Sequence, residues 1–302
     1  MRGAFYIVGP TATGKSELAA RVAATCGGEI ISADAFQIYA GLDLLTAKPV
    51  PEVLAAVPHH LMGTMPLDQE MSAERFRVEA LAAIANVRGR GKPAFIVGGS
   101  GMYVKALTHG LSPLPRGTSL LRDQLDQLTP GELLVRLGQL DRSTAGRIDS
   151  RNKRRLTRAV EICLLTGRPV SAQRVTWSRD RDFSGVFVFR DREELYERIN
   201  SRVLTMFERG VVDEVRAAGA VGSTAAKTLG LRQIHDLLDG RVTEAECIGS
   251  IQQATRRYAK RQLTWFQRQS NFELLNLSLH DLSAAIEWIS RKARLSFTPQ
   301  DD

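Results

Sequence analysis

The chain has few cysteines and no long apolar run. Only three of its 302 residues are cysteine, and Cys26, Cys163 and Cys247 lie far apart with no CxxC pair. This spacing argues against a disulfide framework and a cysteine-based zinc site, and predicts that the thiols are small core side chains. The first apolar run, residues 4–8, is far shorter than a secretory or membrane-spanning segment. We therefore expect a cytoplasmic protein.

Acidic residues are outnumbered by basic ones. The 33 Asp and Glu against 41 Lys and Arg give a net charge of +8 and a pI near 9.7. Residues 142–181 hold eleven Arg or Lys, and residues 247–272 hold five without one carboxylate. Clustered cations release counterions from phosphate backbones, so both stretches are candidate RNA-contact surfaces. The alternative is that each is an ordinary solvated helix face.

The pattern of apolar segments predicts an α/β fold with a parallel sheet. Short apolar runs that read as buried strands cover residues 4–8, 29–33, 94–98 and 186–189. Helical periodicity covers residues 16–26, 72–88, 153–166, 192–209 and 243–269. The Arg- and Leu-rich residues 114–181 read as a helical insertion into a catalytic core made of residues 1–113 and 182–302. We expect the tail, residues 297–302, to be disordered.

A phosphate-binding loop follows the first predicted strand. Gly9-Pro10-Thr11-Ala12-Thr13-Gly14-Lys15-Ser16 fits the pattern G-x-x-x-x-G-K-[ST] between a strand and a helix. Glycines allow backbone N–H groups to face an anion, the helix N-terminus adds a favourable dipole, Lys15 neutralises phosphate oxygens, and Ser16 can ligate Mg²⁺. The alternative is a glycine-rich turn that binds nothing.

The carboxylate that an NTPase needs at a strand end is missing from the most apolar strand, which runs into Gly98-Gly99-Ser100-Gly101. Asp34 is the acid that follows a strand, and in an open α/β sheet it lies at the carboxyl edge beside the loop. Its carboxylate could hold a metal, as in a kinase, or accept a proton from a nucleophile. A small-molecule kinase therefore stays as one alternative.

Ordered sequence blocks make the chain similar to the tRNA dimethylallyltransferases, also called tRNA isopentenyltransferases. The blocks are GPTATGKSELA from Gly9, EIISADAFQIYAGLD from Glu29, TAKP from Thr46, PHHL from Pro58, RGKPAFIVGGSGMYVKAL from Arg90, RRLTRAVEICLLTGRPVS from Arg154, LYERINSRV from Leu195 and TRRYAKRQLTWF from Thr255. Their order and spacing are specific, and they run through most of the chain.

The resemblance implies a P-loop, nucleotide-kinase-like core and transfer of a dimethylallyl group from dimethylallyl diphosphate to N6 of the adenine 3′-adjacent to the tRNA anticodon. It assigns the diphosphate to Gly9, Thr11, Thr13, Gly14, Lys15, Ser16 and Arg202, with Mg²⁺ on Ser16. Asp34 matches the catalytic carboxylate, which aligns the weakly nucleophilic amine and takes its proton. Arg202, with Lys15 and Mg²⁺, stabilises charge growing on the leaving diphosphate. Without the resemblance, Arg202 is an exposed helix arginine.

The same resemblance implies that the helical insertion grips the anticodon stem-loop and that the target base is flipped out of the stack. Residues assigned to tRNA are Asp34, Gln37, Arg154, Arg155, Arg158, Arg256, Arg257, Lys260 and Arg261. The amide of Gln37 can read an adenine edge, or Gln37 is an ordinary loop residue. We expect Trp265 and Phe266 to pack in the core. His59 and His60 are expected to be structural.

Some positions depart from the family pattern. They are Leu45, Met71, Asp141-Arg142, Asp149-Ser150-Arg151-Asn152 and Leu229-Gly230-Leu231-Arg232-Gln233. They bear on tRNA selectivity more than on the type of reaction. Further alternatives are a cytokinin-type enzyme that prenylates free adenine nucleotides and an RNA-binding protein that keeps only the fold. A monomer is expected by analogy with the family.

Overall fold

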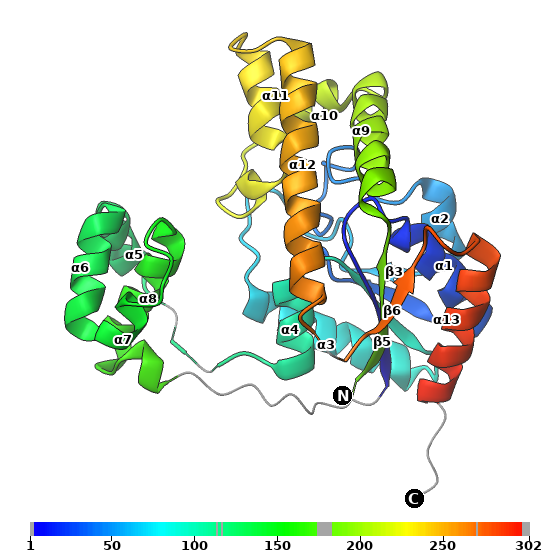
Figure 1. Cartoon of the computed structure of the whole chain (residues 1–302), viewed down its shortest axis with the longest axis horizontal. Coiled ribbons are helices and arrows are strands. Elements are labelled where there is room, and N and C mark those ends of the chain that lie inside the picture. The colour runs from blue at the N-terminus through cyan, green and yellow to red at the C-terminus, as the bar shows by residue number, and fades with distance from the viewer. Residues whose placement is uncertain (1–2, 113, 116, 174–182, 270, 298–302) are drawn as a thin grey trace, which may run out of the picture. The chain divides into compact units, whose positions relative to one another are not determined.

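The computed structural model describes residues 3–112, 114–115, 117–173, 183–269 and 271–297. Its main element is a six-stranded sheet with strand order β3-β2-β4-β1-β5-β6 (Figure 1). The strands are β1 (Ala4–Val8), β2 (Glu29–Ser32), β3 (His59–His60), β4 (Ala94–Gly98), β5 (Ser184–Phe189) and β6 (Glu273–Asn276). Every neighbouring pair is parallel. The predicted α/β class with a parallel sheet is confirmed.

Helices cover both faces of this sheet because its central strands are apolar on both sides. All five residues of β1 are buried. Tyr6 faces a cluster formed with α3 (Ala73–Gly89) and α4 (Gly101–His109), whereas Ile7 faces a second cluster formed with α1 (Lys15–Cys26) and α13 (Leu282–Phe297). Alternation of side chains along a strand requires this split, and a sheet buried on both faces needs near-continuous apolar runs.

The helices of the sheet-containing part are α1 (Lys15–Cys26), α2 (Pro51–Ala56), α3 (Ala73–Gly89), α4 (Gly101–His109), α9 (Arg192–Glu208), α10 (Val211–Ala217), α11 (Leu231–Leu238), α12 (Glu244–Phe266) and α13 (Leu282–Phe297). Helices α9 to α12 lie side by side in Figure 1 and share a third apolar cluster that also takes in Leu42 and Leu45. A short 3₁₀ turn, η2 (Ala225–Lys227), precedes α11. This cluster ties the loop after β2 to helices far along the chain.

Four predicted strands and five predicted helices are present with small shifts of their ends. Helix α12 is shorter than the predicted 243–269, because Thr243 is its N-cap and the helix ends at Phe266. The expectation of a disordered tail is wrong at Phe297, which is the last residue of α13 and packs edge-on against Phe95 at 5.7 Å. Residues 298–302 lie outside the described part.

The chain divides into two compact units, residues 1–110 with 180–302 and residues 111–179. The sequence analysis placed the insertion at 114–181, of which residues 116 and 174–181 lie outside the described part. The second unit consists of α5 (Ser119–Asp126), α6 (Pro130–Leu140), α7 (Arg142–Ala145), α8 (Lys153–Thr166) and the 3₁₀ turn η1 (Val170–Ala172). They enclose their own cluster of leucines and other apolar residues.

Asp141 and Asn152 are structural in this second unit, at two places where the sequence departs from the family pattern through Arg142 and through residues 149–152. Asp141 is 4% exposed and caps α7, accepting hydrogen bonds from the Thr144 N–H at 3.0 Å and the Ser171 N–H at 2.7 Å. Asn152 caps α8 through the Arg155 N–H at 3.1 Å. Both side chains satisfy N–H groups that a helix start would otherwise leave unpaired.

Candidate active site

The phosphate-binding loop joins β1 to α1, and its glycines are required for steric reasons. A Cβ at Gly9 would lie 2.1 Å from the Val188 carbonyl oxygen, so the loop can start only with glycine. Gly14 has φ of 89°, a left-handed conformation that glycine adopts without strain. No side chain in the described part of the chain caps α1, which leaves N–H groups of its first turn available to an anion.

Two buried cations face this loop. Lys15 is 8% exposed, and burial lowers its pKa to about 8, partly offset by the nearby Asp34 carboxylate. Arg202, from α9, donates to the Thr11 hydroxyl at 3.0 Å, and burial lowers its pKa to about 10, again offset by Asp34. The Arg202 Nε is buried and has no hydrogen-bond partner among the residues that the structure describes. Buried, incompletely paired cations are costly, and a bound anion would remove that cost.

Two further arginines hold the loop by its carbonyl groups, and the sequence analysis missed both. Arg190 Nε donates to the Thr13 oxygen and Arg198 Nε to the Ala12 oxygen, each at 2.9 Å. Arg198 Nη2 lies 3.4 Å from the point that a Cβ atom would occupy if Gly14 had a side chain. Arg198 and Arg202 are one helical turn apart in α9, so one helix brings both to the loop. That spacing was the available signal.

Gln262 is a third residue that the sequence analysis missed. It lies in α12, is 5% exposed, and accepts a hydrogen bond from the Thr11 N–H at 2.9 Å. Its amide nitrogen donates to the Gly99 oxygen at 2.8 Å. Gln262 therefore fixes the phosphate loop against the loop that follows β4. Its position in the block TRRYAKRQLTWF was the only signal in the sequence.

Asp34 follows β2 at the carboxyl edge of the sheet, as predicted. Its Oδ1 accepts hydrogen bonds from the Phe36 N–H at 2.9 Å and the Gln37 N–H at 3.4 Å, which shapes the turn after the strand. Ser100 Oγ accepts the Ala35 N–H at 2.9 Å and anchors the same turn to the loop after β4. Within the described residues, no hydrogen bond uses Asp34 Oδ2, which is left for a ligand.

A narrow cavity connects these groups. Its lining includes Lys15 and Ser16 of the phosphate loop, Asp34, Gln37 and His59. The structure thus brings the predicted anion site and the predicted proton acceptor to one place. A buried lysine beside a half-buried carboxylate in one cavity is typical of a catalytic site.

The side chain of Gln37 is held in one orientation. Its Nε2 donates to the Thr46 oxygen at 3.2 Å and to the Ala47 oxygen at 2.9 Å. Both amide hydrogens are therefore used within the protein, and only Oε1 can meet a ligand, as an acceptor. The sequence analysis suggested that this amide recognises an adenine edge. Recognition through both the oxygen and the nitrogen of the amide would require the bonds to Thr46 and Ala47 to break.

His59 and His60 differ in their surroundings. His60 Nε2 lies 2.8 Å from Oε2 of the buried Glu29, which also pairs with Arg90 and Lys92. His59 Nδ1 lies 2.8 Å from the Val57 oxygen, and burial lowers its pKa. His60 is structural, as expected, whereas His59 also lines the cavity.

The basic residues predicted to bind tRNA fall on two helices. On α12, Arg257, Lys260 and Arg261 are exposed at helical spacing, and Arg256 donates to the Asn200 side-chain oxygen at 2.6 Å. Phe266 of the same helix is fully buried and Trp265 packs beside Gly101, so both aromatics lie in the core as predicted.

On α8, Arg154 and Arg155 are exposed. Arg158 instead pairs with the buried Glu161, as Arg122 does at 2.8 Å, and donates to the Pro115 oxygen at 2.8 Å. Arg158 therefore has a structural partner inside its unit, whereas the side chains of Arg154 and Arg155 have none among the described residues.

The described residues hold no helix long and apolar enough to cross a membrane. They also contain no group of three or more His, Cys, Asp or Glu side chains placed to bind a metal.

Comparison with known proteins gives one consistent family. The chain is 43% identical to tRNA dimethylallyltransferase 1 of Citrifermentans bemidjiense, with 87% of this chain and 88% of that protein covered. It is 38% identical to tRNA dimethylallyltransferase of Protochlamydia amoebophila, with coverages of 96% and 88%.

Solved structures agree. The tRNA isopentenylpyrophosphate transferase of Bacillus halodurans superposes with a TM-score of 0.71 at 32% identity, and 98% of each chain is covered. A eukaryotic dimethylallyltransferase solved acting on tRNA gives 0.77 at 26% identity, covering 94% of this chain and 75% of that one. A family model described as IPP transferase matches residues 37–269. The chain belongs to the IPP transferase family.

Proposed function

We propose that the protein transfers a dimethylallyl group from dimethylallyl diphosphate to N6 of the adenine 3′-adjacent to the anticodon of tRNA. The observation that carries this proposal is the cavity lined by the buried Lys15 and by Asp34, with Arg202 near enough to lower the pKa of Lys15 and to have its own pKa raised by Asp34. An anionic leaving group and a proton acceptor are the two things that this reaction requires.

The allylic C–O bond of the donor breaks, and its electron pair leaves with the diphosphate. The lone pair of the adenine amine forms the new C–N bond, and the amine's proton passes to the Asp34 carboxylate. Lys15, Arg202 and the α1 N-terminus stabilise the charge that grows on the diphosphate. The loop that Gln262, Arg190 and Arg198 hold by its backbone is preorganised for this role.

Mg²⁺ fits the oxygen ligands at this site. Ser16 lines the cavity, and Mg²⁺ commonly binds one or two protein oxygens while phosphate oxygens and water complete its shell. When bound, it would neutralise charge on the diphosphate.

Recognition of tRNA would come from backbone contacts by the exposed arginines and lysine of α8 and α12, with the target base flipped toward Asp34. We assign Arg154 and Arg155 to a contact surface on the second unit, and Arg257, Lys260 and Arg261 to a contact surface on the sheet-containing unit. We also propose that the protein works as a cytoplasmic monomer. The second unit would hold the anticodon stem-loop.

The test incubates purified protein and Mg²⁺ with labelled dimethylallyl diphosphate and either unmodified tRNA or AMP. Label in N6-dimethylallyladenosine at the position 3′ of the anticodon would support the proposal. Label only in AMP would favour a cytokinin-type enzyme. ATP turnover without a prenyl donor would favour a kinase. Strong binding of tRNA with no transfer would leave an RNA-binding protein.

A further inference from the structure

The loop after β2 contains a compact turn whose two ends are held by different parts of the protein. Within residues 42–48 the Thr46 N–H bonds to the Leu42 oxygen at 3.1 Å, and the Lys48 N–H bonds to the Asp43 oxygen at 2.9 Å. These bonds leave N–H groups unpaired at the start of the turn and carbonyl groups unpaired at its end, as at the ends of any helical turn.

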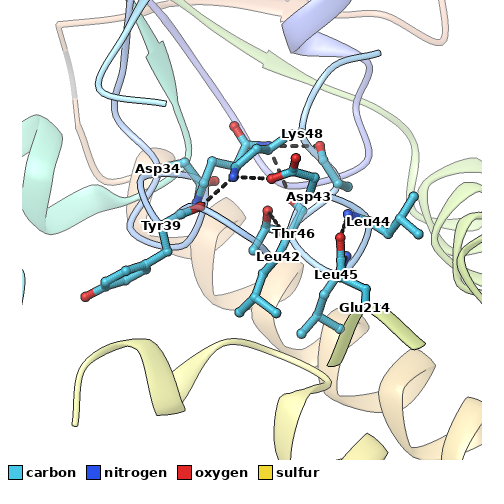
Figure 2. Close-up of polar contacts among 11 residues, drawn as sticks. Asp34, Tyr39, Leu42, Asp43, Leu44, Leu45, Thr46, Lys48 and Glu214 are labelled. Atoms are coloured by element: carbon cyan, nitrogen blue, oxygen red, sulfur yellow. Dashed lines mark hydrogen bonds and ion pairs between the residues drawn. The ribbon is translucent and has the colours of Figure 1, made fainter. Parts of the chain in front are cut away.

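The N–H end is held by a carboxylate from α10. Glu214 accepts hydrogen bonds from the Leu44 N–H and the Leu45 N–H, each at 2.8 Å and each to a different carboxylate oxygen (Figure 2). Glu214 is 169 or more residues away from this turn in the sequence. A carboxylate that accepts two backbone N–H groups makes bonds stronger than those between neutral groups.

The carbonyl end is held by Gln37. As described above, its Nε2 donates to the Thr46 and Ala47 oxygens. Lys48, 6% exposed at its side chain, donates to the Tyr39 oxygen and the Asp43 carboxylate, each at 2.5 Å, and closes the loop behind the turn (Figure 2). The turn therefore links Glu214 to Gln37, which lines the cavity with Asp34.

We propose that Glu214 is a positioning residue for the side of the active site that receives the adenine of tRNA. It acts through residues 42–48 and Gln37. The proposal rests on the proposed function for its choice of substrate. Without the Glu214 carboxylate, the Leu44 and Leu45 N–H groups must hydrogen-bond to water instead, and the turn becomes less ordered. Gln37 then loses the carbonyl groups that orient its side chain. Within the part of the chain that the structure describes, no hydrogen bond joins the phosphate loop to this turn, so use of the donor is spared.

Asp213 provides a matched control. It is the neighbouring acid in the first turn of α10, is exposed, and pairs with Arg216 instead of the turn. Glu214→Gln and Asp213→Asn remove the same charge from the same helix end, so their effects through the helix dipole are alike. Glu214→Ala additionally removes the acceptor oxygens.

Steady-state kinetics with tRNA and dimethylallyl diphosphate provide the first readout. Glu214→Ala should lower kcat/KM for tRNA about tenfold or more and change the KM for the donor less than about twofold, with Glu214→Gln between it and the wild type. Asp213→Asn should match the wild type. Equal losses for both substrates, or a loss that only follows a lower melting temperature, would overturn the proposal.

A double-mutant cycle tests the route. If Glu214 acts through Gln37, Glu214→Ala should cost little in the Gln37→Ala background, because neighbouring residues in one network are not additive. Additive losses would contradict that route.

Amide hydrogen exchange gives a readout independent of activity. Exchange in the peptide covering residues 42–48 should be faster in Glu214→Ala and unchanged in Asp213→Asn. Unchanged exchange in Glu214→Ala overturns the positioning role. A wild-type protein that transfers no dimethylallyl group to tRNA rejects the proposed function instead, and the exchange comparison still decides whether Glu214 holds the turn.

Discussion

Asp34 has two separable tasks at the scale of a single residue. Its Oδ1 shapes the turn after β2, and its carboxylate is the proposed proton acceptor. Asp34→Asn keeps an oxygen for the turn but removes the base, so we expect kcat to fall about 10²- to 10⁴-fold. The affinity for tRNA should change little, because one carboxylate contributes little to a large phosphate-dominated interface. Single-turnover kinetics and filter binding measure the two quantities.

Asp34→Ala should lose turnover to a similar extent while also loosening the turn. Unchanged turnover in both variants would remove Asp34 as the base.

Lys15 predicts a pH dependence for anion binding. Burial lowers its pKa to about 8 in the free protein, so Lys15 carries its charge below that pH and loses it above. Binding of inorganic diphosphate above pH 8 must therefore take up a proton, and the affinity should fall by up to about tenfold for each further pH unit.

Calorimetry from pH 7 to 9.5 checks this. Diphosphate itself also titrates, so the Lys15→Met variant serves as the reference: it should bind more weakly and with a shallower slope. Identical slopes for the two proteins would contradict the assignment to Lys15.

Sequence patterns located Lys15, Ser16 and Asp34 because their chemistry follows from local spacing, a strand followed by a loop and a helix. Gln262 and Glu214 were not found, because the groups that they bind are 251 and about 170 residues away. The orientation of Gln37 was also out of reach, since it depends on carbonyl groups that exist only in the folded turn. The resemblance, and not the pattern, pointed to Arg202.

At the scale of elements, α8 carries two kinds of arginine. One kind stabilises the helical unit, and the other is exposed and is proposed to bind RNA. Glu161 is 1% exposed and pairs with Arg122 and Arg158. Arg158→Ala should lower the free energy of unfolding by about 1–3 kcal/mol, because it weakens the pairing of a buried carboxylate. Arg154→Ala should leave that free energy within about 0.5 kcal/mol of the wild type.

The affinity for tRNA should show the reverse pattern when it is measured under conditions where both variants are folded. Arg154→Ala should lower the affinity, whereas Arg158→Ala should not. Urea denaturation and filter binding measure the two effects. Equal losses of stability in both variants would show that the ion pair with Glu161 is not the reason why Arg158 stabilises the unit.

The strands that the sequence predicted are those buried on both faces, such as β1 and β4, where apolar runs are unmistakable. β3 was missed because it has only two residues. β6 was missed because its four residues lie at the sheet edge, where two of them are exposed and the apolar pattern is weak. Burial on both faces therefore decided which strands could be read from the sequence.

At the scale of the whole molecule, the net charge of +8 predicts binding of tRNA that weakens steeply with salt. Exposed Arg257, Lys260 and Arg261 of α12 are the proposed phosphate contacts in the sheet-containing unit. Each contact that is removed should lower the slope of log K against log salt by about 0.7 to 0.9, with affinity lost alike for every tRNA. The KM for dimethylallyl diphosphate should stay the same.

Arg21→Ala separates a contact effect from a loss of net charge. Arg21 is an exposed residue of α1 and pairs with Glu17 at 2.8 Å. α1 packs with α13 on the sheet face opposite to the one where Phe266 of α12 packs. Arg21→Ala and Lys260→Ala both change the net charge by one unit, so a long-range field alone would weaken tRNA binding equally in both. We expect only Lys260→Ala to reduce the salt slope, because counterions are released where a side chain meets a phosphate. Equal slopes in the two variants would show that α12 attracts tRNA without contacting it.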